Sequence, residues 1–259
     1  MADIYVTELG TEGPRIVLVH GSAQGSSVGG NKHYLGQLAL AEQGWQLAIP
    51  DRPGHGRSPA PGRPDDFELD GEWVAEMLGE GAHLVGHSYG GLVALAAAAL
   101  RPGAVKSLTL VEGAMQSLTL DDPRTQDFVK RMVEAFSGAS SPAEVATRFM
   151  QVAGIPNEIT GRRDAAELDA MGKASLTIRL PTPERVRELI EAVAANQIPL
   201  LTVSGGWEPG IDASSERAAQ VGGGHYVRIE SPHHLPQNHD PVAFNAVFTE
   251  HMKKAEALA

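Results

Sequence analysis

Gly86-His87-Ser88-Tyr89-Gly90-Gly91 is the stretch of this chain that decides its fold. Residues 83–85 before it predict the end of a buried strand, and the alanine-rich residues 92–100 after it predict a helix that packs closely on a sheet. A strand that turns directly into a helix cramps the backbone at Ser88, so the positions two before and two after it must be very small. Glycine stands at both positions, and the pattern therefore predicts a nucleophilic serine at a strand-to-helix turn.

The composition excludes several classes of protein. With 259 residues and 42% apolar content, the chain can bury a full core. The formal net charge of -11 opposes binding to phosphate backbones, which requires clustered Lys and Arg, so we expect no nucleic-acid partner. The absence of Cys excludes disulfides, thiolate metal sites and a cysteine nucleophile. Residues 1–13 lack the apolar core of a signal peptide, and no run approaches the roughly 18 apolar residues of a membrane span, which predicts a soluble, cytoplasmic protein without a membrane partner.

Strand-like apolar runs alternate with helix-like segments along the chain. This alternation is typical of a mostly parallel sheet covered on both faces, so the predicted fold class is α/β. Apart from the strand before Ser88, the predicted strands are residues 15–19, 46–49, 105–111, 198–203 and 225–229. A closing amphipathic helix is predicted over residues 241–252, with Val242, Phe244, Val247 and Phe248 on its buried face.

Residues 113–197 interrupt the alternation with helical patterns only. Ser141-Pro142 and Thr182-Pro183 predict the starts of two helices within this segment. We expect a core domain of residues 1–112 and 198–259 and a helical cap of residues 113–197, unless this segment packs as a surface of a homodimer. The large apolar side chains that we nominate for substrate binding are Met115, Phe128, Met132, Phe136, Met150 and, outside the cap, Trp207.

Four motifs resemble those of the α/β-hydrolase-fold enzymes, in the same order and over nearly the whole chain. They are His20-Gly21, the loop Asp51-Arg52-Pro53-Gly54-His55-Gly56-Arg57-Ser58, the Gly86 to Gly90 elbow and the tail His234-Leu235-Pro236-Gln237-Asn238-His239-Asp240-Pro241. The resemblance implies an α/β-hydrolase fold with Ser88 as the nucleophile, His234 as its base and an acidic residue between them. The tail departs from the family at His233, where Gly is frequent, and at His239, where an acidic residue is frequent; the spacing to Pro241 aligns His234.

A serine hydroxyl needs two partners to act as a nucleophile at neutral pH. An imidazole must take its proton, and a carboxylate must orient that imidazole. His233 and His234 both follow the last predicted strand, and the helix start downstream favours His234. The other eight histidines are expected on the surface or in loops, without a role.

The acid has two candidates. Glu112 ends a predicted strand, and Glu208 lies in a Gly-rich loop after the next strand, with Asp212 close behind. We prefer Glu112, because a carboxylate at a buried strand end is costly unless something pairs with it, whereas Glu208 is expected to be solvated. An acid at this earlier position resembles zearalenone-type lactone hydrolases, a branch of the same family.

Two backbone N–H groups should stabilise the oxyanion of a tetrahedral intermediate, each contributing about 3 kcal/mol. Tyr89 supplies one of them, and Ser22 the other, with Ala23 as the alternative. The predicted reaction is acyl transfer to water from an ester or lactone of a small apolar or aromatic molecule, with no cofactor and no metal. Two other functions stay open: a lyase or cofactor-free oxygenase on the same scaffold, and a ligand-binding protein with a vestigial triad.

Overall fold

A seven-stranded sheet forms the centre of the protein, with the strand order β1-β3-β2-β4-β5-β6-β7. The computed structural model describes residues 4–21 and 23–258, without the side chains of residues 158 and 159. β1 pairs antiparallel with β3, and the other neighbouring strands pair in parallel, which confirms the predicted α/β class. The strands are β1 (Val6–Leu9), β2 (Arg15–Val19), β3 (Gln46–Pro50), β4 (Ala82–His87), β5 (Val105–Val111), β6 (Leu200–Ser204) and β7 (His225–Arg228).

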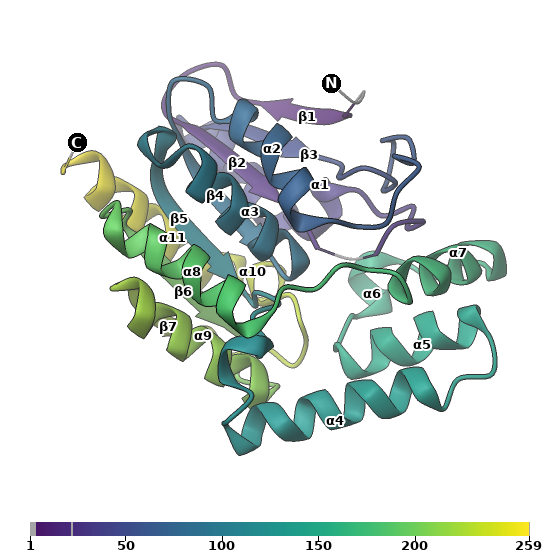
Figure 1. Cartoon of the computed structure of the whole chain (residues 1–259). Coiled ribbons are helices and arrows are strands. Elements are labelled where there is room, and N and C mark those ends of the chain that lie inside the picture. The colour runs from purple at the N-terminus through teal and green to yellow at the C-terminus, as the bar shows by residue number, and fades with distance from the viewer. Residues whose placement is uncertain (1–3, 22, 259) are drawn as a thin grey trace.

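Helices cover both faces of this sheet (Figure 1). Successive side chains of a strand point to opposite faces. Ile16 and Leu18 of β2 accordingly join one apolar cluster, and Val17 and Val19 join the other. The first cluster contains residues of α11 (Pro241–Glu256), and the second contains residues of α2 (Phe67–Met77), α3 (Tyr89–Leu100) and α8 (Pro183–Ala195).

Four helices between β5 and β6 lie to one side of the sheet (Figure 1). They are α4 (Pro123–Ser137), α5 (Pro142–Val152), α6 (Asn157–Thr160) and α7 (Ala165–Ser175). Ser141 caps α5 with Pro142 as its first residue, as its sequence predicts, and Asp122 caps α4 in the same way. α4 packs against α9 (Pro209–Gly222), and α5 packs against α7. The remaining elements are short: α1 (Gly30–His33), α10 (Pro236–His239) and the 3-10 helices at Leu35–Gln43, Pro102–Ala104 and Gln116–Thr119.

α8 belongs to the layer of helices on the sheet, which differs from the expected cap of residues 113–197. Its apolar residues lie in the same cluster as those of β4 and β5. The helices that stand off the sheet therefore fall within residues 123–175. Apolar residues at helical spacing predict a buried stripe on a helix, but they do not say which partner covers it. The buried stripe of α8 consists of Val186, Leu189, Ile190 and Val193.

Other differences concern exposed elements. β1 and α2 were not expected, because β1 is only partly buried and α2 mixes acidic and apolar residues. Val242, expected on the buried face of α11, is 80% exposed, since it lies two residues from Phe244 and hence on the opposite side of the helix. No helix in the described part of the chain is both long and apolar enough to cross a membrane.

Candidate active site

Ser88 lies at the sharp turn between β4 and α3. Its backbone has φ 54° and ψ -124°, a left-handed conformation that residues other than glycine rarely adopt. A Cβ atom at Gly86 would lie 2.4 Å from the carbonyl oxygen of Gly90, and one at Gly90 would lie 2.3 Å from the carbonyl oxygen of Val19. The two flanking glycines are thus required sterically, as the sequence pattern predicts.

The chain after β2 passes directly over the serine. A Cβ atom at Gly21 would lie 2.6 Å from the Cβ and 3.1 Å from the Oγ of Ser88. Tyr89 begins α3, so its N–H is among the helix-terminal donors without an intrahelical acceptor. Ser22, nominated for the oxyanion hole, lies outside the described residues, and its alternative Ala23 is buried beside this loop.

Glu112 and His234 meet at the carboxyl edge of the sheet. Glu112 follows β5 with φ 48° and is 1% exposed. Its Oε2 lies 2.7 Å from Nδ1 of His234 and accepts a hydrogen bond of 2.8 Å from Nε1 of Trp207, while Oε1 accepts one of 2.5 Å from the N–H of Gly205. A carboxylate so placed fixes the neutral His234 with its proton on Nδ1, which leaves Nε2 free to accept a proton.

The two alternative acids are engaged elsewhere. Glu208 caps α9 by accepting from the N–H of Gly210, and its Oε2 lies 2.7 Å from Nη2 of Arg131 on α4. The side chain is buried, so the expectation that Glu208 is solvated is wrong: the cap and the arginine together satisfy it. Asp212 accepts from Ser204 Oγ at 2.5 Å and from a loop N–H. Among the described contacts, those of His234 include Glu112 and neither of the other two carboxylates.

The described hydrogen bonds and ring contacts of His233 are with groups other than this carboxylate. Its Nδ1 accepts from the N–H of Leu235 at 3.2 Å, and its ring packs edge-on against His239 at 5.3 Å. The structure therefore brings Glu112 together with His234 and not with His233.

A row of buried histidine rings leads away from His234, which the sequence reasoning missed. The ring of His234 lies 4.8 Å from that of His87, and His87 lies 5.5 Å from His33. His33 in turn stacks on His20 at 5.0 Å, and His20 packs against His55 at 5.0 Å. The expectation of surface or loop placement is wrong for His33, which ends α1, and for His87, which ends β4. His20 and His55 lie in loops, as expected, but both side chains are buried. The sequence feature that could have indicated their burial is that three of them stand next to motif residues, in His20-Gly21, His55-Gly56 and His87-Ser88.

Hydrogen bonds fix the state of the histidine next to the serine loop. His20 Nε2 accepts from the N–H of Arg52 at 2.8 Å, so its Nδ1 carries the proton that it donates to the carbonyl of Gly21 at 2.7 Å. Burial lowers the pKa of His20 and of His87 well below the usual 6.5. The described residues contain no group of three or more His, Asp or Glu side chains that could hold a metal ion.

Mild acid should destabilise the protein through these neutral histidines. Burial, followed by the charges of neighbouring groups, lowers the pKa of His33 from 6.5 to about 3. Between these two values the unfolded chain binds the proton and the folded protein does not, so the free energy of unfolding falls as the pH falls. Urea denaturation measures the free energy of unfolding at pH 5 and at pH 7.5. We expect the loss of this free energy between pH 7.5 and pH 5 to be about 2 kcal/mol smaller in His33→Phe than in the wild type. An equal difference in the wild type and the variant would contradict the assignment.

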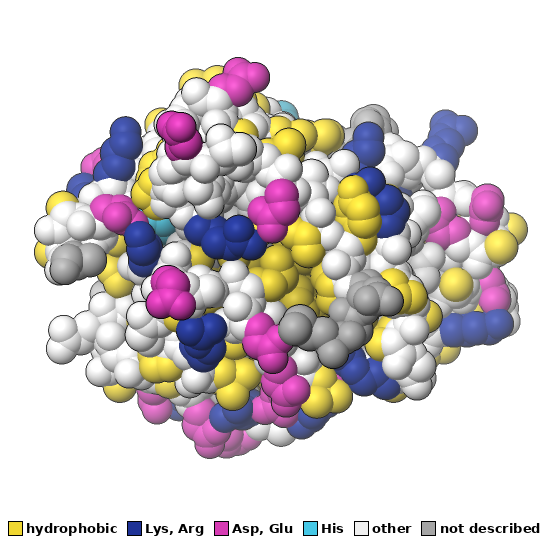
Figure 2. Space-filling view, turned by 90° about the horizontal axis from the view of Figure 1, so that it is seen from above, with side chains coloured by type: hydrophobic (Ala, Val, Ile, Leu, Met, Phe, Trp, Pro, Cys, Tyr) yellow, Lys and Arg dark blue, Asp and Glu magenta, His cyan; other side chains and the backbone are white. Residues whose placement is uncertain are grey.

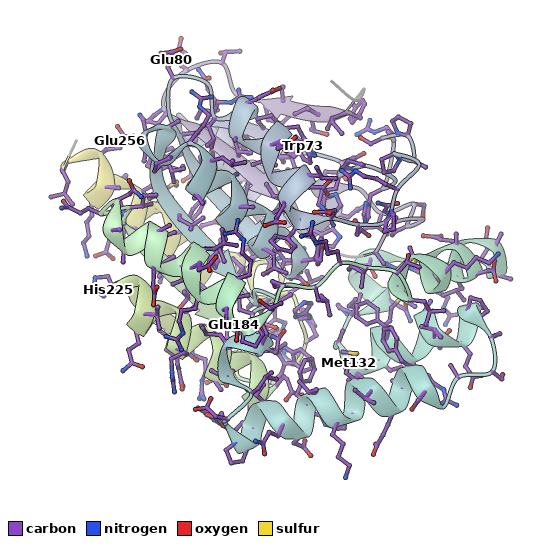
Figure 3. The ribbon with its side chains drawn as sticks, viewed as in Figure 1. Trp73, Glu80, Met132, Glu184, His225 and Glu256 are labelled. Carbon is purple, nitrogen blue, oxygen red and sulfur yellow. The ribbon has the colours of Figure 1, made fainter. Side chains whose placement is uncertain are left out.

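The nominated substrate-binding residues fall into two groups. Trp207 reaches the site: its indole lies edge-on to His234 at 6.0 Å and packs on Gly154, where a Cβ atom would lie 2.6 Å from the ring. Met132 is partly buried on α4 and points toward α5 (Figure 3), and Phe136 on α4 packs edge-on against Phe149 on α5.

The other nominees are packing residues. Met115 is fully buried against Gly113, in the apolar cluster that contains residues of β4, β5 and α3, and not among the helices that stand off the sheet. Phe128 contacts Gly210 of α9. Met150 of α5 lies in the same apolar cluster as Met171 of α7. Apolar residues at helical spacing predict burial, but do not separate a pocket lining from a helix contact.

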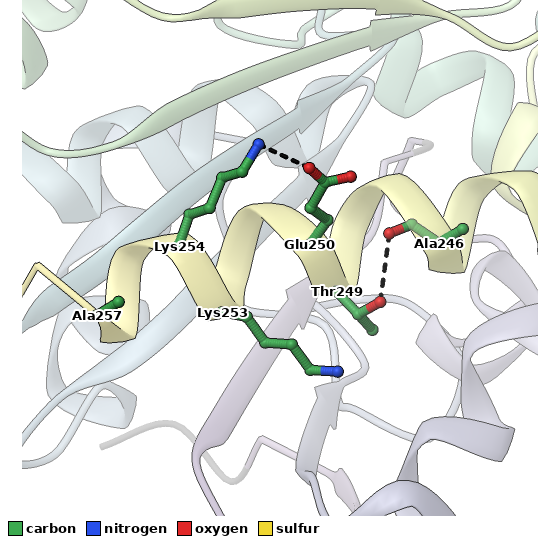
Figure 4. Close-up of a pocket in the computed structure, with 6 residues that line it drawn as sticks. All are labelled: Ala246, Thr249, Glu250, Lys253, Lys254 and Ala257. Atoms are coloured by element: carbon green, nitrogen blue, oxygen red, sulfur yellow. Dashed lines mark hydrogen bonds and ion pairs between the residues drawn. The ribbon is translucent and has the colours of Figure 1, made fainter.

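Two surface hollows lie away from the serine. One, of about 480 Å³, runs along α11 beside Thr249, Lys253 and Ala257 (Figure 4). The other, of about 360 Å³, lies along α8 beside Arg187 and Glu191. Lys and Arg side chains are interspersed with Asp and Glu on the face in Figure 2, which gives this face no basic patch for a polyanion.

Known proteins share this fold and its motifs. The sequence pattern of the alpha/beta hydrolase fold matches residues 14–213. The chain is 32% identical over 155 residues to a pimeloyl-[acyl-carrier protein] methyl ester esterase of Methylococcus capsulatus, a match that covers 58% of each chain. It is also 32% identical over 154 residues to Lipase LipV of Mycobacterium tuberculosis, a match that covers 56% of this chain and 55% of the lipase. The chain thus spans little more than half the length of these two relatives.

A solved structure gives the same result for the fold. A hydrolase from Pseudomonas aeruginosa PA01 aligns with a TM-score of 0.69 and 22% identity, over 97% of this chain and 94% of that one. At this identity the likeness concerns the fold alone. The family pattern, in contrast, covers well over half of the sequence, including the elbow at Ser88. The chain belongs to the α/β-hydrolase-fold family.

Proposed function

We propose that this protein is a serine hydrolase that cleaves a carboxylic ester or a lactone of a small apolar or aromatic molecule. Ser88 is the nucleophile, His234 the base and Glu112 the acid. The observation that carries the proposal is the 2.7 Å contact of His234 Nδ1 with the buried carboxylate of Glu112, at the sheet edge where Ser88 occupies its strained turn. The esterase and lipase named among the relatives support ester bonds as the target.

The mechanism follows from the protonation state of His234. Its Nε2 takes the proton of Ser88 Oγ while the oxygen attacks the carbonyl carbon, and Glu112 stabilises the imidazolium that forms. His234 then protonates the leaving alcohol, and an acyl-enzyme remains. A water molecule, deprotonated by His234, attacks the acyl carbon and releases the acid and free Ser88. No step of this sequence calls for a cofactor.

The oxyanion of each tetrahedral intermediate is stabilised by backbone N–H groups. Tyr89 donates from the first turn of α3, where the helix dipole also favours negative charge. The second donor is Ser22 or Ala23, the two residues that follow Gly21 in the sequence, and Gly21 itself packs against Ser88. The buried guanidinium of Arg52 stacks on the Tyr89 ring at 4.7 Å and thereby supports the position of this donor.

The proposal predicts hydrolysis of simple esters without added cofactor. We expect saturable release of p-nitrophenol from p-nitrophenyl esters of short and medium acyl chains, and acid release from an acyl lactone in a pH-stat. The rate measured with Ser88→Ala gives the ester hydrolysis that does not depend on Ser88, and it serves as the control. Wild-type rates equal to those of Ser88→Ala on every ester and lactone would contradict the proposal.

A further inference from the structure

Arg163 is a buried cation with an incomplete set of partners. Its side chain is 4% exposed, in the segment between α6 and α7. Its Nη1 donates to three neutral oxygens: Thr160 Oγ1 at 2.9 Å, the carbonyl of Gly161 at 2.8 Å and Asn157 Oδ1 at 3.5 Å. Its Nε is buried and has no hydrogen-bond partner. A buried N–H of a charged group without an acceptor is costly, so the site favours an anion that would accept from it.

The nearest carboxylate only partly neutralises this arginine. Glu167 Oε1 lies 3.9 Å from Arg163 Nε, beyond hydrogen-bond distance. The same oxygen already accepts two hydrogen bonds of 2.8 Å, from the N–H and the Oγ of Ser27. Burial lowers the pKa of Arg163 despite the opposing effect of Glu167. Glu167 therefore pairs with the guanidinium at a distance and leaves the Nε hydrogen without an acceptor.

His33 presents a second unsatisfied group next to this arginine. The side chain is 5% exposed, and neither ring nitrogen has a hydrogen-bond partner. His33 ends α1, and α1 packs against α6, which ends three residues before Arg163. The charge of Arg163 accordingly contributes to lowering the pKa of His33, after burial and the charges of His55 and His234. Its ring also lies 5.5 Å from that of His87, which borders the ring of His234. His33 thus links Arg163 to the base of the proposed mechanism.

The segment that carries Arg163 spans the site. At one end, the carbonyl of Gly154 accepts a hydrogen bond of 2.9 Å from the N–H of His234, and Trp207 packs on the same glycine. At the other end, Glu167 holds the Ser27 loop, a few residues beyond the turn over Ser88. Arg163 lies between these two attachments in the sequence, within the segment that connects the His234 side of the site to the Ser88 side.

We propose that Arg163 and His33 bind a carboxylate group of the substrate whose ester Ser88 attacks. The inference rests on the proposed function: it keeps the ester or lactone bond and adds a carboxylate to the otherwise apolar substrate, as in half-esters of dicarboxylic acids. Arg163 supplies one positive charge, and the neutral imidazole of His33 supplies one N–H donor. One cation and one neutral donor match a monoanionic carboxylate better than a phosphate dianion.

Two esters of equal chain length test the proposal. Mono-p-nitrophenyl glutarate carries a carboxylate, and p-nitrophenyl pentanoate does not. The quantity compared is kcat/KM for the glutarate ester divided by kcat/KM for the pentanoate ester. We expect this ratio to fall about tenfold or more in Arg163→Gln, because only the glutarate ester loses a hydrogen-bonded ion pair. Arg163→Lys should restore part of the ratio, and Arg162→Gln, which alters the exposed neighbouring arginine, should leave it unchanged. An unchanged ratio in Arg163→Gln would overturn the proposal.

A binding measurement separates this proposal from the proposed function. Monomethyl glutarate and methyl pentanoate are titrated into Ser88→Ala by calorimetry, with and without Arg163→Gln. We expect the anionic ester to bind about tenfold more weakly to the double variant, and the neutral ester to be affected less. Binding that depends on Arg163, with no turnover by the wild type, would refute the hydrolase and retain the subsite. Equal binding of monomethyl glutarate with and without Arg163, or no binding at all, would refute the subsite.

Discussion

Replacing Glu112 by glutamine should lower kcat by about 10⁴-fold, the loss seen when a triad carboxylate becomes an amide. The carboxylate Oε2 accepts from both His234 Nδ1 and Trp207 Nε1, and Oε1 accepts from the Gly205 N–H. An amide has one oxygen, so its NH₂ group must face one of these donors. If it faces His234, the proton moves to Nε2, and the base can no longer take the proton of Ser88. The loss should appear in kcat on any ester that the wild type hydrolyses.

Glu208→Gln is the matched control for this variant. Glu208 is also a buried carboxylate after a neighbouring strand, β6, but it caps α9 and pairs with Arg131. Its amide should weaken the attachment of α4 to α9 and lower the free energy of unfolding by about 1 kcal/mol, with kcat within a few-fold of the wild type. Comparable turnover of the wild type and Glu112→Gln would contradict the assignment, and so would a larger loss in Glu208→Gln.

Ser88→Ala should lower kcat by about 10⁶-fold, since the covalent route is lost. His234→Ala should lower it by a similar factor, and the double variant by no more than either single one, because the two residues act as a unit. Alanine fits the turn as well as serine does, and the two flanking glycines keep their contacts, so the fold should be retained. Turnover by folded Ser88→Ala within an order of magnitude of the wild type would show that another group attacks the substrate.

The features that the sequence predicts best are those with a strict local cause. Gly86 and Gly90 are required because a Cβ atom at either position would lie only 2.4 or 2.3 Å from a backbone carbonyl oxygen. The helix start at Ser141-Pro142 follows from a side-chain cap and a proline that lacks an N–H. The continuous apolar run of residues 16–19 in β2 predicts a strand buried on both faces.

The features that the sequence could not predict depend on partners far away in the chain. The stripe on α8 looks the same whether it covers the sheet or another helix, so its place in the fold is set by tertiary packing alone. His33 and His87 are 54 residues apart in sequence, and their rings meet only because α1 and the end of β4 lie at the same sheet edge. The buried carboxylate of Glu208 pairs with Arg131, which lies 77 residues earlier in the chain.

The central claim is that Ser88 is an activated nucleophile, and intact-mass spectrometry after incubation with a fluorophosphonate tests it most directly. The wild type and Ser88→Ala are treated side by side, with folding checked by circular dichroism. We predict one covalent adduct on the wild type and none on Ser88→Ala. No adduct on folded wild-type protein, or an adduct that persists in Ser88→Ala, would contradict the account.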